Sequence, residues 1–459
     1  MTTTTGRRAV LRGSGLAVLL TGQTMASMDG SIVTVALQTI RVELGANDAA
    51  LQLIVSGYIL TMGVLIVTCA RIGDLIGHRR AFLAGLAGFT VASLLCGLAP
   101  TPAALVGARI LQATGAAAMI PQVFSLIQLG YDGEARKRAI GVYSMVLALG
   151  VALGQVIGGL IISADILGLG WRPAFLVNVP VGAVLLAAGT RLLPAATRSS
   201  AARLDFPGVT ILTLSMSALI APLIFGREYG WQPWIWFSLL AGLAGIALFV
   251  PVERRVHNPV LDLGSLRTPG VKPGLLACFL IMGCYTAFLF ALTLHLQDAL
   301  GFSPLQAGLA FAPFALGFGA LSLTWSRLPP RFQAMLPTIG PLTFATCAVL
   351  LVHLSADRWP ALTSIPLLML AGAGHASGYS PLIARLSSIV GPSYASALSA
   401  FNSTGTMLAS VIGVAALGGL FVAASTTSAG LWLTMRLTAG LLVVTAVCAR
   451  RVRVLAPEA

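Results

Sequence analysis

The feature that most constrains this chain is a series of apolar segments, each close to the roughly 20 residues that cross a lipid bilayer as a helix. Fourteen such segments recur along the whole sequence, and short stretches carrying most of the charge separate them. Their predicted ranges are 15–37, 51–70, 81–99, 103–127, 139–163, 173–194, 206–225, 232–251, 273–295, 304–325, 333–353, 360–382, 395–423 and 428–449. Because backbone in hydrocarbon must satisfy its own hydrogen bonds, we predict an all-α polytopic membrane protein.

The composition supports this prediction. Of the 459 residues, 57% are hydrophobic and 9% are charged, whereas about 25% of the residues of a soluble domain are charged. The six cysteines lie within or at the edges of the apolar segments, and none forms a CxxC pair. We interpret them as small buried side chains, and we expect neither a disulfide framework nor a metal site.

The net charge of +14 would suit a nucleic-acid-binding protein, but the basic residues are scattered through the short loops. With the N-terminus placed in the cytoplasm, 22 of the 28 lysines and arginines fall in cytoplasmic segments, four fall outside and two lie within spans. This distribution follows the positive-inside rule. We therefore predict a multi-pass membrane protein with both termini in the cytoplasm, lipid around it and no nucleic-acid partner. Only two lysines accompany 26 arginines, a composition typical of a GC-rich bacterium, so we expect a bacterial cytoplasmic membrane.

A dense charged segment, Arg71 to Arg80, joins the second and third predicted spans. It resembles the loop of the major facilitator superfamily that reads Gly-x-Leu-Ala-Asp-Arg-x-Gly-Arg-Arg/Lys. The chain matches that loop at Asp74, Gly77 and Arg79, and it departs from it at Ala70, Ile72, Gly73, Leu75 and His78. We interpret Asp74, Gly77, Arg79 and Arg80 as a cytoplasmic latch between two conformations. A solvated loop would explain the arginines but neither the acid nor the glycine.

Two further segments extend the resemblance. In the fourth span, residues 109–115 are similar to the family pattern Arg-x-x-Gln-Gly-x-Gly. In the fifth span, residues 150–159 are similar to the exporter motif Gly-x-x-x-Gly-Pro-x-x-Gly-Gly, with Gln155 in the place of the proline. Segments 28–37 and 171–180 resemble patterns of the fourteen-span drug:proton antiporter branch of the superfamily.

The resemblance implies a major facilitator fold of two six-helix bundles plus two additional central helices. An internal repeat agrees with it, because similar residues open the second span at 44–52 and the tenth span at 300–306. The expected organisation is an N-terminal bundle over 1–194, two linker helices and a cytoplasmic loop over 195–272, and a C-terminal bundle over 273–459. We expect a monomer.

One acid, Asp29, lies deep in a predicted span, where an ionised and unpaired carboxylate would cost about 2.5–3.5 kcal/mol or more. At 1.5 Å per residue, Asp29 and Arg109 lie at similar depths below the outer surface, about 12 and 9 Å, so the two charges could meet on facing helices. We interpret them as a site that couples proton and substrate. The alternatives are a permanently neutral Asp29 in a packing hydrogen bond and an Arg109 that snorkels to the outer interface.

Three further sets of residues are also candidates for the site. Gly150, Gly154 and Gly158, with Gly159 beside them, fall on one helix face and predict close packing or a hinge, next to Gln155. Gln112, Asn178 and Asn402, like Gln155, are expected to form hydrogen bonds between helices and could line a cavity. His375 is a second candidate for proton coupling, with a hydrogen-bonded structural histidine as the alternative.

Several functions are excluded by what the chain lacks. Its two lysines, at 137 and 272, do not stand in a GxxxxGK[ST] phosphate loop, and the HExxH and GxSxG motifs are absent. We therefore expect neither an enzyme nor a cofactor, and the longest loop is too short for a receptor domain. The predicted function is proton-coupled efflux of a hydrophobic or amphipathic small molecule, a drug or natural product, by alternating access. The alternative is a proton-coupled uptake symporter of a small organic solute.

Overall fold

The computed structural model of the chain describes residues 11–164, 168–194, 205–226, 230–256, 262–355, 358–391, 394–424 and 426–455. All regular structure in these residues is helical, which confirms the all-α prediction. The N-terminal half contains α1 (Gly13–Leu44), α2 (Asp48–Ile76), α3 (His78–Gly97), α4 (Pro102–Gly130), α5 (Gly133–Ser163), α6 (Pro173–Leu176) and α7 (Asn178–Leu192). Two helices follow, α8 (Phe206–Phe225) and α9 (Pro233–Glu253).

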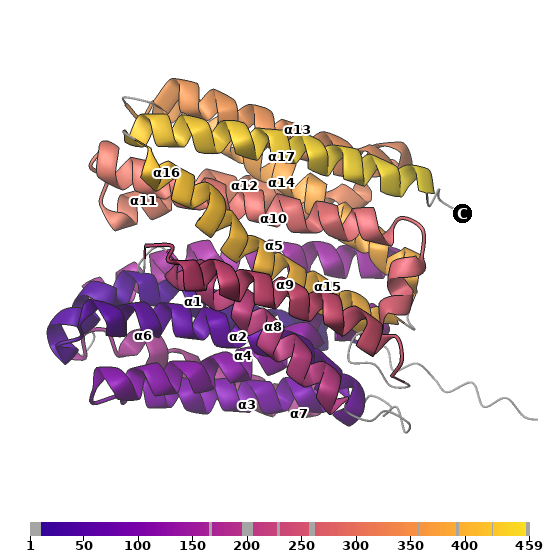
Figure 1. The fold of residues 1–459 in the computed structure, drawn as a ribbon, viewed down its shortest axis with the longest axis horizontal. Helices are drawn as coiled ribbons and strands as arrows, with labels where there is room; N and C mark the ends of the chain where they lie inside the picture. The colour runs from indigo at the N-terminus through magenta and orange to yellow at the C-terminus, as the bar shows by residue number, and fades with distance from the viewer. Residues whose placement is uncertain are drawn as a thin grey trace, which may run out of the picture.

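The C-terminal half begins with the short 3-10 helix η2 (Leu263–Arg267) and α10 (Val271–Leu294). It continues with η3 (His295–Ala299), α11 (Pro304–Ala310), α12 (Ala312–Thr324), η4 (Trp325–Arg327), α13 (Pro330–Ser355), α14 (Ala361–Val390), α15 (Ala395–Ile412), η6 (Gly413–Gly418), α16 (Gly419–Ala423) and α17 (Thr427–Leu455). In Figure 1 most helices of the N-terminal half form one layer of the molecule and most of those from α10 onward form the other, while α5 and α15 lie between the two layers.

Ten helical segments in the described part of the chain are long and apolar enough to cross a membrane. The multi-pass membrane class is therefore confirmed. Long helices also cover the predicted spans at 15–37, 139–163 and 360–382, and α8 contains a shorter apolar stretch. The number fourteen stays a prediction, as do the domain boundaries at 194 and 272.

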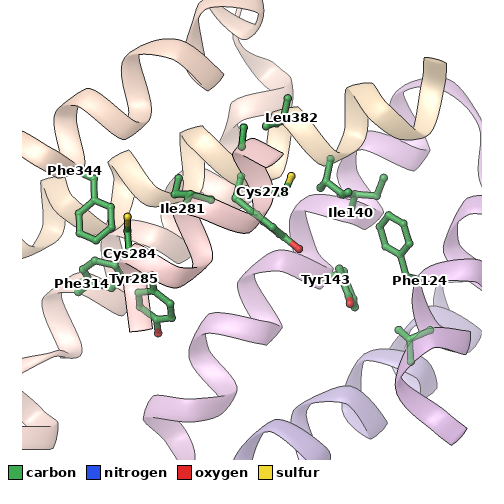
Figure 2. Close-up of a cluster of buried hydrophobic side chains, with 14 of the residues drawn as sticks. Phe124, Ile140, Tyr143, Cys278, Ile281, Cys284, Tyr285, Phe314, Phe344 and Leu382 are labelled. Carbon is green, nitrogen blue, oxygen red and sulfur yellow. The ribbon is translucent and has the colours of Figure 1, made fainter. Parts of the chain in front are cut away.

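The linker helices cover one side of the junction between the halves. Apolar side chains of α2, α8, α9 and α15 form a single cluster, to which Val67, Ile220, Phe249 and Ala400 belong. A larger cluster runs through both halves, and Figure 2 shows Phe124 and Tyr143 on one side of it and Tyr285 and Phe314 on the other. Apolar burial therefore holds the two layers together around a continuous core.

Polar contacts also join the halves, at the end of the molecule where α2 meets α3. The amide of Gln128 donates to the carbonyl of Ala395 at 3.2 Å and accepts from the hydroxyl of Ser387 at 2.8 Å. The hydroxyl of Ser399 donates to the carbonyl of Pro121 at 2.8 Å. The end of α4 is thereby bound to α14 and α15.

Candidate functional site

The centre of the candidate site is a buried ion pair between α1 and α4. Asp29 lies at the middle of α1, and a guanidinium nitrogen of Arg109 approaches its Oδ2 to 2.5 Å. Both residues are 1% exposed. Snorkelling of Arg109 to the outer surface is therefore wrong for this structure, because the guanidinium is bound inside the bundle. Charge-assisted hydrogen bonds between a guanidinium and a carboxylate are stronger than hydrogen bonds between neutral groups.

Amide side chains complete the surroundings of the carboxylate. Oδ1 of Asp29 accepts a hydrogen bond from the amide of Gln112 at 2.8 Å and another from the amide of Asn178 at 3.1 Å. Gln112 also accepts from Arg109 at 2.5 Å and donates to Ser93 on α3 at 2.8 Å. Three donors thus converge on one carboxylate, which is the arrangement a buried charge requires.

The guanidinium of Arg109 has partners on α2 and α6 as well. Its Nε donates to the carbonyl of Ile54 at 3.2 Å. Its carbon lies 4.0 Å from the ring centre of Tyr58 and 5.6 Å from that of Phe175, distances at which a cation is attracted to an aromatic face. The hydrogen bonds of this network therefore connect α1, α2, α3, α4 and α7, and the ring of Phe175 adds a contact with α6.

Glycines on α5 let α1 pack close enough to hold Asp29 in place. A Cβ atom on Gly154 would lie 2.5 Å from the carbonyl oxygen of Met28, the residue before Asp29. Cβ atoms on Gly150 and Gly158 would lie 2.5 Å and 2.6 Å from side-chain atoms of α1. The predicted close packing face is therefore present, whereas a hinge stays a prediction. Gly159 is half-buried, and the side chain of Gln155 lies outside the described part of the structure.

The turn between α2 and α3 is built on one glycine. Gly77 has φ of 92° and is both the last cap of α2 and the first cap of α3, and L side chains rarely adopt this conformation. Asp74 lies 3.2 Å from Arg71 and 3.6 Å from the ring of His78. Arg79 donates to the carbonyl of Thr190 on α7, while Arg80 is exposed.

His78 anchors this turn to the bundle. Its ring lies 2.8 Å from the amide oxygen of Gln122 on α4, and the amide of Gln122 donates to the carbonyl of Cys69 at 2.8 Å. Sequence analysis noted His78 only as a departure from the family loop and did not single out Gln122. The one signal in the sequence was that Gln122 is a polar residue within a predicted apolar span.

The remaining candidates lie in the C-terminal half, apart from the ion pair. His375 is buried on α14 among aromatic rings, with Tyr285 at 4.5 Å and Phe318 at 4.9 Å between ring centres. Asn402 on α15 bonds to the hydroxyl of Tyr379, 2.9 Å from its amide nitrogen. The structure therefore brings together Asp29, Arg109, Gln112 and Asn178, but neither His375 nor Asn402 joins them.

Other residues were missed by sequence analysis. Ser93 and Ile54 complete the site together with Tyr58, but the types of Ser93 and Ile54 are common in any span and gave no signal. Glu253 is a further buried acid, at 2% exposure, because α9 continues two residues beyond the predicted end of its span. Within the described residues, no group of three histidines, cysteines or acids could hold a metal ion.

Comparison with known proteins agrees with the fold. The sequence model of the Major Facilitator Superfamily matches residues 19–414. The puromycin resistance protein of Streptomyces alboniger is 35% identical over 416 residues, which are 88% of this chain and 80% of the relative. The cephamycin export protein of Amycolatopsis lactamdurans is 33% identical over 429 residues, 90% and 86% of the two chains.

A third relative, the probable actinorhodin transporter of Streptomyces coelicolor, is 33% identical over 419 residues, 89% of this chain and 72% of the relative. Among solved structures, the human organic anion transporter MFSD10 superimposes with a TM-score of 0.68 at 15% identity, covering 95% of this chain and 99% of its own. At that identity the likeness concerns the fold alone.

These observations define a membrane transporter with a helical-bundle fold, which is a class of protein without enzymatic activity. The chain belongs to the major facilitator superfamily, and its relatives include bacterial exporters of drugs and antibiotics.

Proposed function

We propose that this protein exports a hydrophobic or amphipathic small molecule, a drug or natural product, across the cytoplasmic membrane in exchange for protons. The observation that carries the proposal is the buried pair of Asp29 and Arg109. An intramembrane acid is costly and marks proton or substrate pathways in transporters. Two relatives are named a resistance protein and an export protein, which supports transport of the substrate out of the cell.

In the proposed mechanism the protein has fourteen spans and both termini in the cytoplasm. A proton that enters from outside binds Asp29 and removes the charge that holds Arg109. The five helices joined at this network then change their packing, and the site opens inward. Substrate binding at the cytoplasmic side displaces the proton, and the ion pair forms again.

An accumulation assay tests the proposal. Cells that express the protein should hold less puromycin than cells that do not, and a protonophore should remove the difference because the gradient drives the transport. Puromycin is chosen because a relative of high coverage confers resistance to it. Higher accumulation on expression would indicate uptake, and a difference that persists with the protonophore would exclude coupling to protons.

Asp74 is proposed to act in the conformational change and not in binding, because its ion pair with Arg71 and its contact with His78 lie at the end of α2. We expect Asp74→Asn to slow turnover about tenfold, a barrier increase of about 1.4 kcal/mol. Substrate affinity should stay within about threefold, under ~1 kcal/mol. Transport rates against substrate concentration measure both quantities.

Asp132→Asn is the matched control, since Asp132 pairs with Arg136 at the same end of the molecule but is 65% exposed. It should leave both quantities unchanged. A large loss of affinity in Asp74→Asn with normal turnover would place Asp74 in the substrate site instead.

A further inference from the structure

A basic pocket lies where the second linker helix meets the C-terminal half. It has a volume of about 390 Å³, and its walls come from the end of α9, the 3-10 helix η2 and the start of α10. Arg254, Arg267 and Lys272 supply three positive charges to its lining, and Leu263 and Leu266 supply apolar surface. The pocket is separate from the Asp29 network, which lies within the N-terminal helices.

The three cations are available to a ligand. All three are exposed, and none of them has a carboxylate within 4.0 Å in the described residues. The lining also contains two acids, so its three cations outnumber its acids by one. Asp262 accepts the backbone N–H of Gly264 at 2.8 Å, and Glu253 is 2% exposed and bound inside the fold. The pocket therefore presents net positive charge to an anion.

An apolar helix face leads directly to these cations. Leu240, Leu243, Ala247 and Pro251 on α9 are exposed and follow one another at intervals of three or four residues, so they share a face that ends at Arg254. Only 17% of the most apolar part of α9 is buried. A ligand that fits both surfaces has a hydrocarbon chain along the helix and an anionic group at its end.

We propose that this pocket binds the phosphodiester head group of an anionic glycerophospholipid, with one acyl chain lying along the exposed face of α9. Basic pockets between helices at the membrane surface bind lipid phosphates in this way. The ligand would connect the linker helices to the first helix of the C-terminal half. This binding is independent of transport, so it can be tested whatever the exported substrate is.

The test is native mass spectrometry of the full-length protein in detergent, titrated with phosphatidylglycerol. We expect the triple variant Arg254→Gln/Arg267→Gln/Lys272→Gln to bind this lipid about tenfold more weakly, because it removes the three cations of the pocket. The matched control is Arg450→Gln/Arg451→Gln/Arg453→Gln, which removes three exposed cations from the end of α17 and should bind as the unchanged protein does.

Two comparisons distinguish the ligand. Phosphatidylethanolamine should bind more weakly than phosphatidylglycerol, because the three cations of the pocket would repel its ammonium group. Glycerol phosphate, the head group without chains, should not displace the lipid. If either of these two expectations is wrong, the proposed site is excluded. It is also excluded if both triple variants lose lipid binding equally, or if neither triple variant loses lipid binding. If the pocket variant does not fold, the single variants Arg254→Gln and Lys272→Gln should each weaken binding about twofold, and unchanged binding in both would exclude the site.

Discussion

We expect Asp29→Asn to reduce active efflux to the level of cells that lack the protein. Asparagine keeps the size and the hydrogen-bond acceptor of Asp29 but cannot release a proton in each cycle. Efflux is measured as puromycin accumulation with an imposed proton gradient. Asp29→Glu should keep partial activity with a changed pH profile, because the charge remains but moves by about one methylene group.

Asp29→Asn alone leaves Arg109 without its carboxylate partner, and a double variant avoids this loss. Removing one partner of a buried ion pair leaves the other charge uncompensated, at a cost of about 3–5 kcal/mol. The double variant Asp29→Asn/Arg109→Gln removes both charges together, so it should fold and still fail to pump. Glu43→Gln is the control, because Glu43 lies on the same helix and pairs with Arg172 at 3.1 Å, but it is about one-third exposed. It should transport normally.

A clear result would contradict the assignment of Asp29. If Asp29→Asn still moves substrate against its gradient, and collapse of the proton gradient still stops it, the proton is carried elsewhere. His375 would then become the leading candidate, since it is the buried histidine that lies among the aromatic rings of the C-terminal half.

The second large effect is expected for Gly154→Leu, which should abolish export. The new side chain would begin 2.5 Å from the carbonyl oxygen of Met28, and a backbone atom cannot rotate away as a side chain can. The middle of α1 would have to move from α5, and Asp29 would move with it. Efflux, surface expression and thermal stability of the purified protein are the measurements.

Gly107→Leu is a suitable control for this variant. Gly107 also lies in a helix of the N-terminal half, but it is exposed and a Cβ atom there meets nothing within 4 Å. The Gly107→Leu variant should reach the membrane and export substrate normally. Unchanged export by Gly154→Leu would mean that α1 and α5 need not pack as closely as the structure places them.

The meeting of Asp29 and Arg109 could be predicted because charge in a span is rare and both depths follow from helix geometry. Their remaining partners could not be predicted in the same way. Gln112 and Asn178 were recognised as polar residues of spans, but which carboxylate they bind depends on helix rotation, which apolar sequences do not specify. Tyr58 and Ile54 contribute a ring face and a backbone carbonyl, for which residue type gives no signal.

Helix ends show a second limit of sequence analysis. The hydropathy of α14 falls near residue 382, yet the helix continues to Val390, and α17 continues to Leu455 against a predicted end at 449. Hydropathy reports where hydrocarbon ends, whereas a helix continues into the interface because its backbone bonds are internal. Ser387, which contacts Gln128, lies in such an extension.

The contacts of Gln128 with Ser387 and Ala395, and of Ser399 with Pro121, have a consequence for the energetics of switching. All of their donors and acceptors are neutral, so each contributes about 0.5–1.5 kcal/mol, and screening by dissolved salt does not weaken them as it weakens exposed ion pairs. These three bonds can be broken without any ion or counter-ion being moved. The free energy needed to break these bonds when the two halves separate is therefore the same at low and at high salt concentration.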